Sequence, residues 1–341
     1  MENYYFLKNK YYPKTLNDLC LDKNIIILLK YLIKLNNLNI LFISNPGTCK
    51  TTLINIILKY YYNDKFIDYN NLIDDKFMND NSNYCNFNKY NENILYINSL
   101  KDNGISYYRS EVKTFCQTKS SIVNKKKIII IDDLDTINEQ TQQIIRNYID
   151  NYSNNINVLS SCNSIQKIID PMQSRLNIIK INNINVDNMR IIFDNICKNE
   201  NMLFDTETKD YIINISHNSI STMINYIEKI RLLDSGLSLN LCKNICTNIS
   251  YTIFEKYILA CKNNDLVNAI NIIMSLNHIG YSVIDILDNI YLFVNITNIL
   301  NEEQKYEIIK IICKYIKIFH NIHENDIELY FFTNNIINIL I

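Results

Sequence analysis

Residues 38–52 read LNILFISNPGTCKTT, an apolar run followed by a short polar loop and the start of a helical pattern. The apolar run is typical of a buried strand. A strand, a tight loop, a Lys-Thr pair and a helix N-terminus together form a phosphate cradle, because backbone N–H groups and the helix dipole face the anion. In such a cradle Lys50 reaches the outer phosphates and the Thr51 hydroxyl is placed for Mg²⁺.

The loop departs from the usual P-loop pattern, G-x-x-x-x-G-K-[ST]. Ser44 and Cys49 stand at the two glycine positions. Their side chains add atoms where the backbone should approach phosphate. Taken alone, the segment fits both a nucleotide site and an ordinary strand-loop-helix connection.

A second apolar strand ends in acidic residues. It spans 128–132, so that Asp132 is its last residue, and Asp133, Leu134 and Asp135 follow. In P-loop proteins such a strand lies beside the loop, and its first acid holds Mg²⁺ through water. The next acid could polarise an attacking water. Acids at strand ends also form turns, but the two elements in one sheet favour a nucleotide site.

Short β-rich runs alternate with helical patterns over the first half of the chain, which predicts a parallel sheet covered by helices. Strands are also expected at 94–97, 157–161 and 177–181, and helices near 51–61, 105–117 and 138–150. Residues 62–93 are rich in Tyr, Asn and Asp and show little periodicity, so we expect a surface insertion there.

After about residue 183 the strand patterns stop and helical patterns continue to the end of the chain. Apolar residues recur at three- and four-residue spacing, as in Val283, Ile286, Leu287, Ile290 and Phe293. We therefore predict three parts: an α/β domain at 1–183, a helical lid at 184–235, and an all-helical domain at 236–341.

Four stretches carry recognisable motifs: 10–16 (KYYPKTL), 47–51 (GTCKT), 132–135 (DDLD) and 162–175 (CNSIQKIIDPMQSR). They resemble motifs of replication factor C small subunits, K-Y-R-P-K-T-L, G-T-G-K-T, D-E-A-D and C-N-x-x-x-K-I-I-E-P-x-Q-S-R-C. The family's L-N-A-S-D-x-R-G-I-x-x-V-R is matched at Asn98, Gly104, Ile105 and Arg109. The match keeps its order over nearly the full length, apart from 62–93.

The resemblance implies an AAA+ fold: an α/β P-loop domain with a parallel sheet, a helical lid, and an all-α collar domain that holds five subunits in a ring. It implies ATP-dependent loading of a sliding clamp onto primer-template DNA during replication and repair. ATP and Mg²⁺ would be the cofactors, and the partners would be the other loader subunits, the clamp and DNA. The expected location is the nucleus or another intracellular site of DNA replication.

The same resemblance implies roles for individual residues. The nucleotide would be bound by Tyr11, Pro13, Asn45, Pro46, Gly47, Thr48, Cys49, Lys50, Thr51 and Thr52. Tyr11 and Pro13 would flank the adenine, and Thr51 with Asp132 would bind Mg²⁺.

Three catalytic roles are also implied. Asp133 would act on the attacking water, and Asn163 would be the sensor near the γ-phosphate. Arg175 would enter the neighbouring subunit's ATP site as an arginine finger, stabilising charge in the phosphoryl-transfer transition state. The plain alternative for Arg175 is a surface ion pair of small energetic weight.

The catalytic residues depart from the family pattern. Asp133 replaces a Glu and is one methylene shorter, Ser221 lies where the family's lid places an arginine, and Leu176 replaces the Cys of S-R-C. Lys50 and Arg175 persist. The pattern predicts that nucleotide binding and the trans-acting arginine outlast efficient hydrolysis at this subunit's own site.

Contacts with DNA would have to be local, because the formal net charge is −1. Arg109 and Lys113 are spaced i, i+4 on the helix expected from Ile105, on a different face from Tyr108 and Val112. In the family, helices here line the ring's inner channel and follow duplex phosphates. We predict DNA contacts for Arg109 and Lys113. The basic run 125–127 fits a DNA contact or a solvated turn equally well.

Two other functions remain open from the sequence: a non-hydrolysing scaffold subunit that donates Arg175, or another AAA+ DNA-replication ATPase such as an origin-binding initiator. The ten cysteines form no paired framework, and Cys242 and Cys246 lack further ligands at metal-site spacing. The first residues, MENYYFLKNKYYPK, lack a hydrophobic signal core, and no run approaches the roughly 20 apolar residues of a membrane span. We expect a soluble, intracellular protein without a membrane partner.

Overall fold

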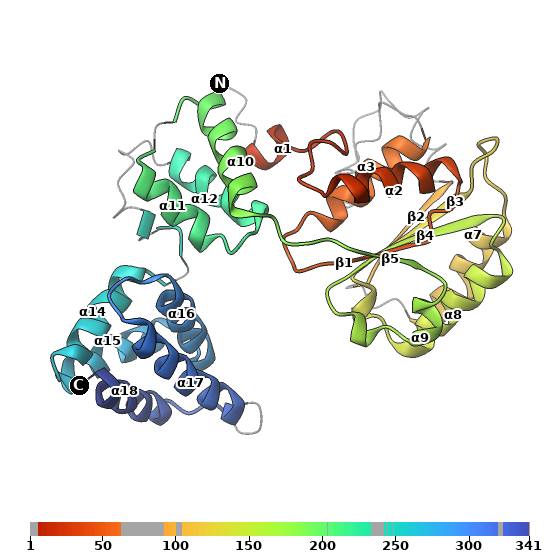
Figure 1. The fold of residues 1–341 in the computed structure, drawn as a ribbon. Coiled ribbons are helices and arrows are strands. Elements are labelled where there is room, and N and C mark those ends of the chain that lie inside the picture. The colour runs from red at the N-terminus through yellow and green to blue at the C-terminus, as the bar shows by residue number, and fades with distance from the viewer. Residues whose placement is uncertain are drawn as a thin grey trace, which may run out of the picture. The chain divides into compact units, whose positions relative to one another are not determined.

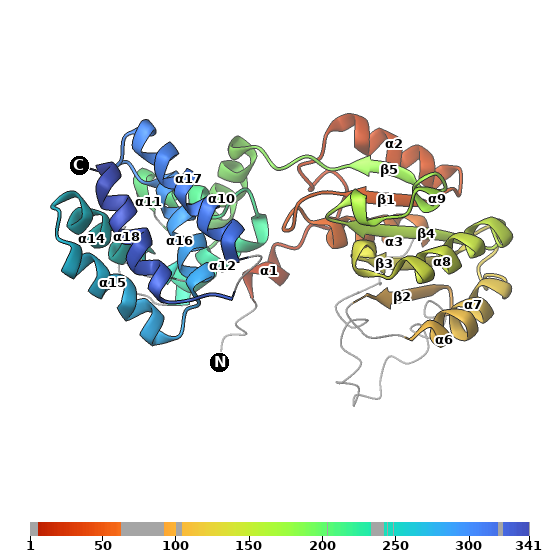
Figure 2. The ribbon, with the colours of Figure 1, turned by 90° about the horizontal axis from the view of Figure 1, so that it is seen from below.

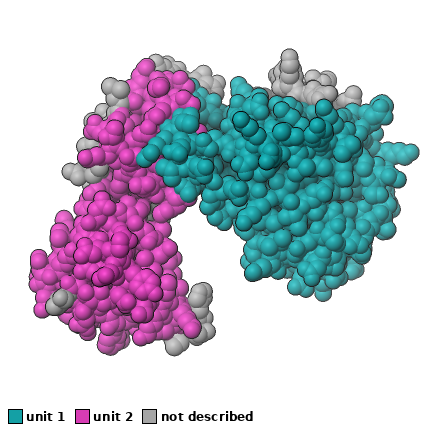
Figure 3. All heavy atoms as spheres, viewed as in Figure 1, with its two compact units in different colours: residues 1–191, 218–222 teal, residues 192–217, 223–341 magenta. Residues whose placement is uncertain are grey.

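The structure is a computed structural model that describes residues 6–62, 92–99, 104–202, 204–232, 242–243, 245–247, 249–319 and 323–340. The chain divides into two compact units (Figure 3). Unit 1 comprises residues 1–191 and 218–222, and unit 2 comprises residues 192–217 and 223–341. The predicted insertion at 62–93 lies, apart from its ends, outside the described residues.

Unit 1 is built on a parallel sheet, and its described part contains five strands in the order β2-β3-β4-β1-β5 (Figure 2). The strands are β1 (Ile40–Ile43), β2 (Ile94–Asn98), β3 (Lys127–Asp132), β4 (Ile156–Cys162) and β5 (Asn177–Lys180). Each lies where the alternation of apolar runs predicted a strand. β1 lies between β4 and β5: Ile40 pairs with Leu159 of β4 and with Asn177 of β5.

Helices cover both faces of the sheet (Figure 1). One face carries α2 (Lys23–Lys34) and α3 (Lys50–Tyr62), and the other carries α7 (Lys113–Gln117) and α8 (Glu139–Asn151). The residues of β3 alternate between the two cores, Ile128 and Ile130 packing on the α3 side and Ile129 and Ile131 on the α8 side. Because both faces are buried, the strand is apolar throughout instead of alternating.

Short elements connect these layers: α1 (Leu7–Lys10), 3₁₀ turns at Leu134–Thr136 and Ile165–Lys167, and α9 (Asp170–Gln173). α1 and α2 were not predicted. In α2, Leu29 is buried and Ile25, Ile26, Leu32 and Ile33 pack on the same core, but Ile27 and Tyr31 are 51% and 61% exposed, so apolar residues outside this stripe obscure its pattern in the sequence.

The helix expected at 105–117 is continuous but not uniform. α6 (Ile105–Tyr107) leads into a π-helical turn, Tyr108–Val112, which passes into α7. Tyr108 and Val112 are buried, as the apolar pattern predicted. A π turn widens the helix locally, and such turns occur frequently at functional sites.

The helices after the sheet are α10 (Val186–Asn199), α11 (Thr206–Ile215), α12 (Ile220–Leu232), α14 (Tyr251–Lys262), α15 (Leu266–Ile279), α16 (Val283–Ile296), α17 (Glu302–Phe319) and α18 (Ile327–Leu340). The last five enclose one apolar core. It contains the five residues from Val283 to Phe293 whose spacing predicted a buried helix face. The predicted order of a parallel α/β sheet followed by helices is therefore confirmed.

Local residues explain where two of these helices end and begin. Gly280, at φ 111°, ends α15 in the left-handed conformation that glycine adopts without a Cβ penalty. Ser282 then caps α16, since its hydroxyl accepts the backbone N–H of Asp285 at 3.1 Å. None of the helices in the described part of the chain combines the length and apolar character that crossing a bilayer requires.

Candidate nucleotide-binding site

The predicted site residues converge at the carboxyl edge of the sheet. The loop 44–49 follows β1, Asp132 ends β3, and Asn163 directly follows β4. The end of β3 lies beside the loop, as predicted, although β4 separates β1 from β3 within the sheet. The residues still meet: Lys50 Nζ donates to Asn163 Oδ1 at 2.7 Å, and Thr51 Oγ1 donates to Asp132 Oδ2 at 3.0 Å.

Lys50 opens α3 and is 8% exposed. Besides Asn163, its ammonium donates to the carbonyl oxygens of Ser44 at 2.8 Å and Asn45 at 3.1 Å. Burial lowers the pKa of Lys50, while the nearby carboxylates of Asp133 and Asp132 oppose that change. The amine is thus held by neutral oxygens at the place where an outer phosphate would offer stronger, charged acceptors.

Asp132 is surrounded by hydroxyl groups. Its Oδ2 accepts from Thr51 and, at 3.4 Å, from Tyr96 Oη, and its Oδ1 accepts a short hydrogen bond from Ser161 Oγ. Burial, followed by the charge of Asp132, raises the pKa of Tyr96 to about 12, so that phenol stays a donor. Neither Tyr96 nor Ser161 was predicted from the sequence.

These oxygens fit a magnesium ion. Mg²⁺ is commonly bound through one or two carboxylates together with waters and substrate phosphates, without a full protein cage. Asp132 and Thr51 supply one carboxylate and one hydroxyl, and the described residues contain no larger cluster of acidic, His or Cys side chains that could hold a metal.

Asp133 has a special backbone conformation and a crowded electrostatic environment. Its φ is 52°, in the left-handed region, and its backbone N–H donates to Ser161 Oγ at 3.0 Å. Burial raises the pKa of its carboxyl, and the charges of Asp132 and Asp135 add to that effect. Its Oδ1 accepts from Asn163 Nδ2 at 3.3 Å. Asn163 therefore bridges Lys50 and Asp133.

Asp135 fixes the backbone at this bridge. Its Oδ2 accepts the backbone N–H groups of Asn163 at 3.3 Å and Ser164 at 3.2 Å. Its other oxygen, Oδ1, is buried without a hydrogen-bond partner in the described part of the protein. The last acid of the 132–135 run thus positions the candidate sensor through its backbone.

The loop accommodates the side chains that stand at the two glycine positions of the motif. Cys49 has φ 64°, a left-handed conformation that its side chain accepts at a cost, and it packs against the apolar core on the α3 side. Burial raises the pKa of its thiol. The Ser44 hydroxyl forms a short hydrogen bond with Thr48 Oγ1, so it is satisfied inside the loop.

Ser219 packs directly on the loop at Gly47, within unit 1. Gly47 has φ 82°, and a Cβ atom added to it would lie 2.2 Å from Ser219 Oγ. Ser219 immediately precedes α12, and its hydroxyl lies 3.4 Å from the backbone nitrogen of Thr222. The sequence drew attention to Ser221 and missed Ser219, because nothing in the local pattern shows that this segment returns to the loop.

The predicted adenine-side residues lie at the end of α1. Tyr11 and Pro13 are half-buried. Tyr12, between them in the sequence, contacts α3: its hydroxyl accepts a hydrogen bond from Asn55 Nδ2 at 3.2 Å. Of the remaining loop residues, Asn45 and Pro46 are exposed, Thr48 is buried and Thr52 is half-buried.

Arg175 lies far from this cradle along the strand direction. It follows α9 and precedes β5, at the amino edge of the parallel sheet, whereas the loop follows β1 at the carboxyl edge. Its Nε donates to Asp150 Oδ1 at 3.3 Å, and its Nη1 donates to Ser174 Oγ at 2.7 Å. The side chain is 34% exposed.

The predicted DNA-contact residues are exposed. Arg109 lies in the π-helical turn and Lys113 opens α7. In the basic run 125–127, Lys127 packs inward, being 6% exposed with its Nζ 4.5 Å from the Phe115 ring centroid, whereas Lys125 and Lys126 are half-buried. Packing of Lys127 weakens the case for a basic DNA-binding patch there.

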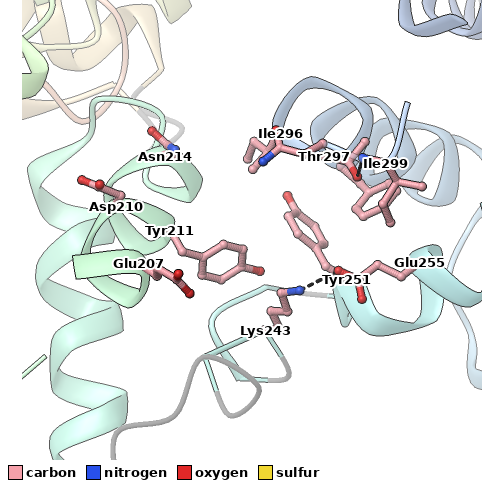
Figure 4. A pocket seen from close by; sticks show the side chains of 12 residues that line it. Glu207, Asp210, Tyr211, Asn214, Lys243, Tyr251, Glu255, Ile296, Thr297 and Ile299 are labelled. Atoms are coloured by element: carbon pink, nitrogen blue, oxygen red, sulfur yellow. Dashed lines mark hydrogen bonds and ion pairs between the residues drawn. The ribbon is translucent and has the colours of Figure 1, made fainter. Parts of the chain in front are cut away.

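A hollow of about 600 Å³ lies in unit 2 between α11 and the helices α14 and α16 (Figure 4). Glu207 and Asp210 line it, as do Lys243 and Glu255, whose charged groups are 2.6 Å apart. Because carboxylates outnumber the single paired amine, the lining is unsuited to phosphate. The cradle of unit 1 remains the candidate site.

Comparison with known proteins supports this assignment. Residues 40–183 match the model of the ATPase family associated with various cellular activities (AAA). These residues form an AAA domain. Among solved structures, the Thermotoga maritima RuvB Holliday junction branch migration motor has a TM-score of 0.50 at 11% identity, over 73% of this chain and 78% of that one. At that identity the likeness shows the fold alone.

Curated relatives carry the predicted family name. The replication factor C small subunit of Sulfolobus acidocaldarius is 27% identical over 67% of this chain and 63% of its own length. Replication factor C subunit 4 of Schizosaccharomyces pombe is 25% identical over 88% and 82%. A putative replication factor C small subunit of Acanthamoeba polyphaga mimivirus is 23% identical over 89% and 87%. The resemblance is confirmed, although the match spans less than two thirds of the length of the subunits from Sulfolobus acidocaldarius and Saccharolobus solfataricus.

Proposed function

We propose that this chain is a subunit of an ATP-dependent sliding-clamp loader and that the cradle of its AAA domain binds ATP with Mg²⁺. The observation that carries the proposal is the meeting of Lys50, Thr51, Asp132 and Asn163 at one edge of the sheet. The domain division would be an α/β domain at 1–183, a lid at 184–235 and a collar at 236–341.

Binding would exchange the internal partners of the cradle for phosphate oxygens. Lys50 would turn from the carbonyls of Ser44 and Asn45 to the outer phosphates, and the backbone N–H groups of 47–51 would face the same anions. Thr51 and Asp132 would hold Mg²⁺, which supplies positive charge against the phosphates. Tyr11 and Pro13 would flank the base.

Hydrolysis at this chain's own site would be slow. Asp133 has one methylene less than glutamate, and its carboxyl is hydrogen-bonded to Asn163. Its raised pKa comes from burial and from neighbouring acids, which favours proton acceptance, but the short side chain limits its reach to a water. Ser221 carries no charge to stabilise the transition state.

The second candidate is a subunit that binds nucleotide without turning it over and serves its neighbour through Arg175. The position of Arg175 favours this role. An arginine at the amino edge cannot face phosphates bound at the carboxyl edge of the same sheet, but it can face a neighbouring subunit.

The partners would be the other loader subunits, the sliding clamp and primer-template DNA, in the nucleus or wherever DNA is replicated in the source. Exposed Arg109 and Lys113 would contact duplex phosphates, which is a sequence-independent interaction. A DNA contact made by a few basic residues is consistent with a formal net charge of −1, because the chain as a whole does not attract DNA.

The test is reconstitution. The chain is combined with the other loader subunits of its source, and clamp loading onto primer-template DNA is measured with and without it. Assembly that depends on the chain and loading that requires ATP would support the proposal. A complex that loads equally well without the chain would exclude it.

A further inference from the structure

At the amino edge of the sheet, one carboxylate binds two guanidinium groups. Asp150 lies near the end of α8, and its Oδ1 accepts from Arg175 Nε at 3.3 Å. Its other oxygen, Oδ2, lies 3.2 Å from Arg146 Nη2, one helical turn earlier. α8 and α9 are neighbours on this side of unit 1 (Figure 1), so the cluster joins the helix to the segment that carries Arg175.

Fold stability does not explain this cluster. Asp150 is the penultimate residue of α8, where the negative end of the helix dipole disfavours a carboxylate. The side chains of Arg146, Arg175 and Asp150 are 33%, 34% and 38% exposed. Ion pairs that are exposed to this degree contribute little to stability, because water screens them.

The contacts do fix an orientation. Asp150 binds Nε of Arg175, and Ser174 Oγ accepts from Nη1 at 2.7 Å. Ser174 is itself anchored, since its hydroxyl donates to the Pro171 carbonyl at 3.0 Å. Two of the three guanidinium nitrogens are thereby held, and Nη2 has no hydrogen-bond partner within the described residues.

We propose that Asp150 is a positioning residue for Arg175, holding its guanidinium so that Nη2 meets an oxygen of the terminal phosphate in the neighbouring subunit's nucleotide. A free arginine side chain loses much rotamer freedom when it binds. Orienting it before the subunits meet lowers that cost and places the charge where it develops in the transition state. The inference rests on the proposed function of Arg175.

The test uses the reconstituted complex with Asp150→Asn, which keeps the side-chain shape and removes the charge. We expect kcat of the DNA- and clamp-stimulated ATPase at the site that Arg175 serves to fall about tenfold, by analogy with the loss seen when a residue that orients a metal ligand is removed. KM for ATP should stay within about twofold, because the positioned contact acts mainly in the transition state. Asp150→Glu should recover part of the loss.

The matched control is Glu139→Gln, which removes an exposed carboxylate from the first turn of the same helix and should leave kcat unchanged. Asp150→Asn is also combined with Arg175→Ala. If Asp150 acts through Arg175, it has nothing left to position and the double variant should match Arg175→Ala alone. Assembly is checked by size-exclusion chromatography, and unfolding midpoints of the free variants separate misfolding from mispositioning.

Each outcome has a distinct meaning. If Arg175→Ala has no effect on kcat, the proposed role of Arg175 fails and the role of Asp150 falls with it. If Arg175→Ala lowers kcat but Asp150→Asn does not, only the positioning role is overturned. A further loss from Asp150→Asn in the Arg175→Ala background would also overturn it, because the carboxylate would then be acting through Arg146 or through the fold.

Discussion

The cradle around Lys50 and the cluster around Arg175 belong to one sheet, yet they are built in opposite ways. Lys50 is 8% exposed and its ammonium makes three hydrogen bonds to oxygens of unit 1. Arg175 is 34% exposed and keeps one nitrogen without a partner in the described part of the chain. The Lys50 ammonium is buried and hydrogen-bonded within the unit, whereas the Arg175 guanidinium is partly exposed.

This difference in exposure determines which of the two sites can act in the free chain. A buried amine held by carbonyls can bind an anion within a single chain, because the phosphate replaces weaker neutral acceptors. An exposed arginine gains little from an anion in water, since the solvent screens the charge. Arg175 would become effective only when a neighbouring subunit excludes that water. The free chain should therefore bind nucleotide, and the assembled ring should need Arg175.

The largest expected effect comes from Arg175→Ala in the assembled complex. Removing an arginine finger lowers turnover at the site it serves by about 10³-fold or more. Total turnover of a ring with several sites should fall only partly, while clamp loading falls further. The ATPase and loading rates of the reconstituted complex measure this.

The nucleotide affinity of the free Arg175→Ala chain is the internal control. It should match the unchanged chain, because Arg175 lies at the edge of the sheet away from the cradle. Weaker nucleotide binding by the free variant, or normal loading by an intact complex, would contradict the separation of the two sites.

A smaller effect is expected from Lys50→Ala on the free chain. Loss of a charged hydrogen bond to phosphate costs about 1.5–3 kcal/mol, so the affinity for Mg²⁺-ADP should fall about 10- to 100-fold. Isothermal titration calorimetry measures the change. Lys59→Ala is the matched control, since Lys59 lies in the same helix beyond the phosphate-facing first turn. Equal affinity in both variants would mean that Lys50 is not a phosphate ligand.

The next effect is on stability and tests how closely Ser219 packs on the loop of the cradle. Gly47→Ala puts a Cβ at a left-handed φ, 2.2 Å from Ser219 Oγ, so we expect the free energy of unfolding to fall by about 1–3 kcal/mol. Ser219→Gly in the same chain should recover the part that is due to the contact. Gly104→Ala is the control, since Gly104 has φ −56° and an added Cβ would make only ordinary contact. Chemical denaturation that shows no recovery would place Ser219 away from the loop.

The sequence could predict the sheet because the signal for it is local. The run at 128–131 is apolar on both faces, which indicates a covered strand whatever its neighbours are. It could not predict that β4 lies between β1 and β3, since strand order depends on where each crossover returns. The same reason hid Tyr96 and Ser219, which reach the cradle from other elements.

The amino edge shows the same limit. Arg175 could be singled out from the run 162–175, but its partner Asp150 could not, because the contact joins α8 to the segment after α9. The sequence also did not predict the left-handed φ of Cys49. A larger residue at a glycine position of this motif indicates either a loop of different shape or the same loop under strain, and only the structure distinguishes the two.

The smallest expected effect concerns the acids at the cradle and has a pH dependence with a definite sign. Burial and the neighbouring acids raise the pKa of Asp133 above 3.8, so the folded chain holds this proton more tightly than the unfolded chain. Its carboxyl therefore lowers stability as pH rises from 3.8 through the folded pKa, and the loss is complete above it. Asp133→Asn removes that penalty, and Asn tolerates the left-handed φ of 52°. We expect the free energy of unfolding to rise by less than about 1 kcal/mol at pH 7, because the site is partly solvated.

The gain should shrink as the pH falls and vanish below 3.8, where the carboxyl is protonated in both states. Asp18→Asn is the opposite-sign control: hydrogen bonds led by the Thr15 backbone N–H lower the pKa of Asp18, so its loss should destabilise the chain at neutral pH. Urea denaturation at pH 7 and at a series of lower pH values measures both variants. A gain for Asp133→Asn that is independent of pH would mean that repacking, and not charge, distinguishes the variant. That result would contradict the electrostatic destabilisation that we attribute to the buried cradle and not to the exposed cluster at Arg175.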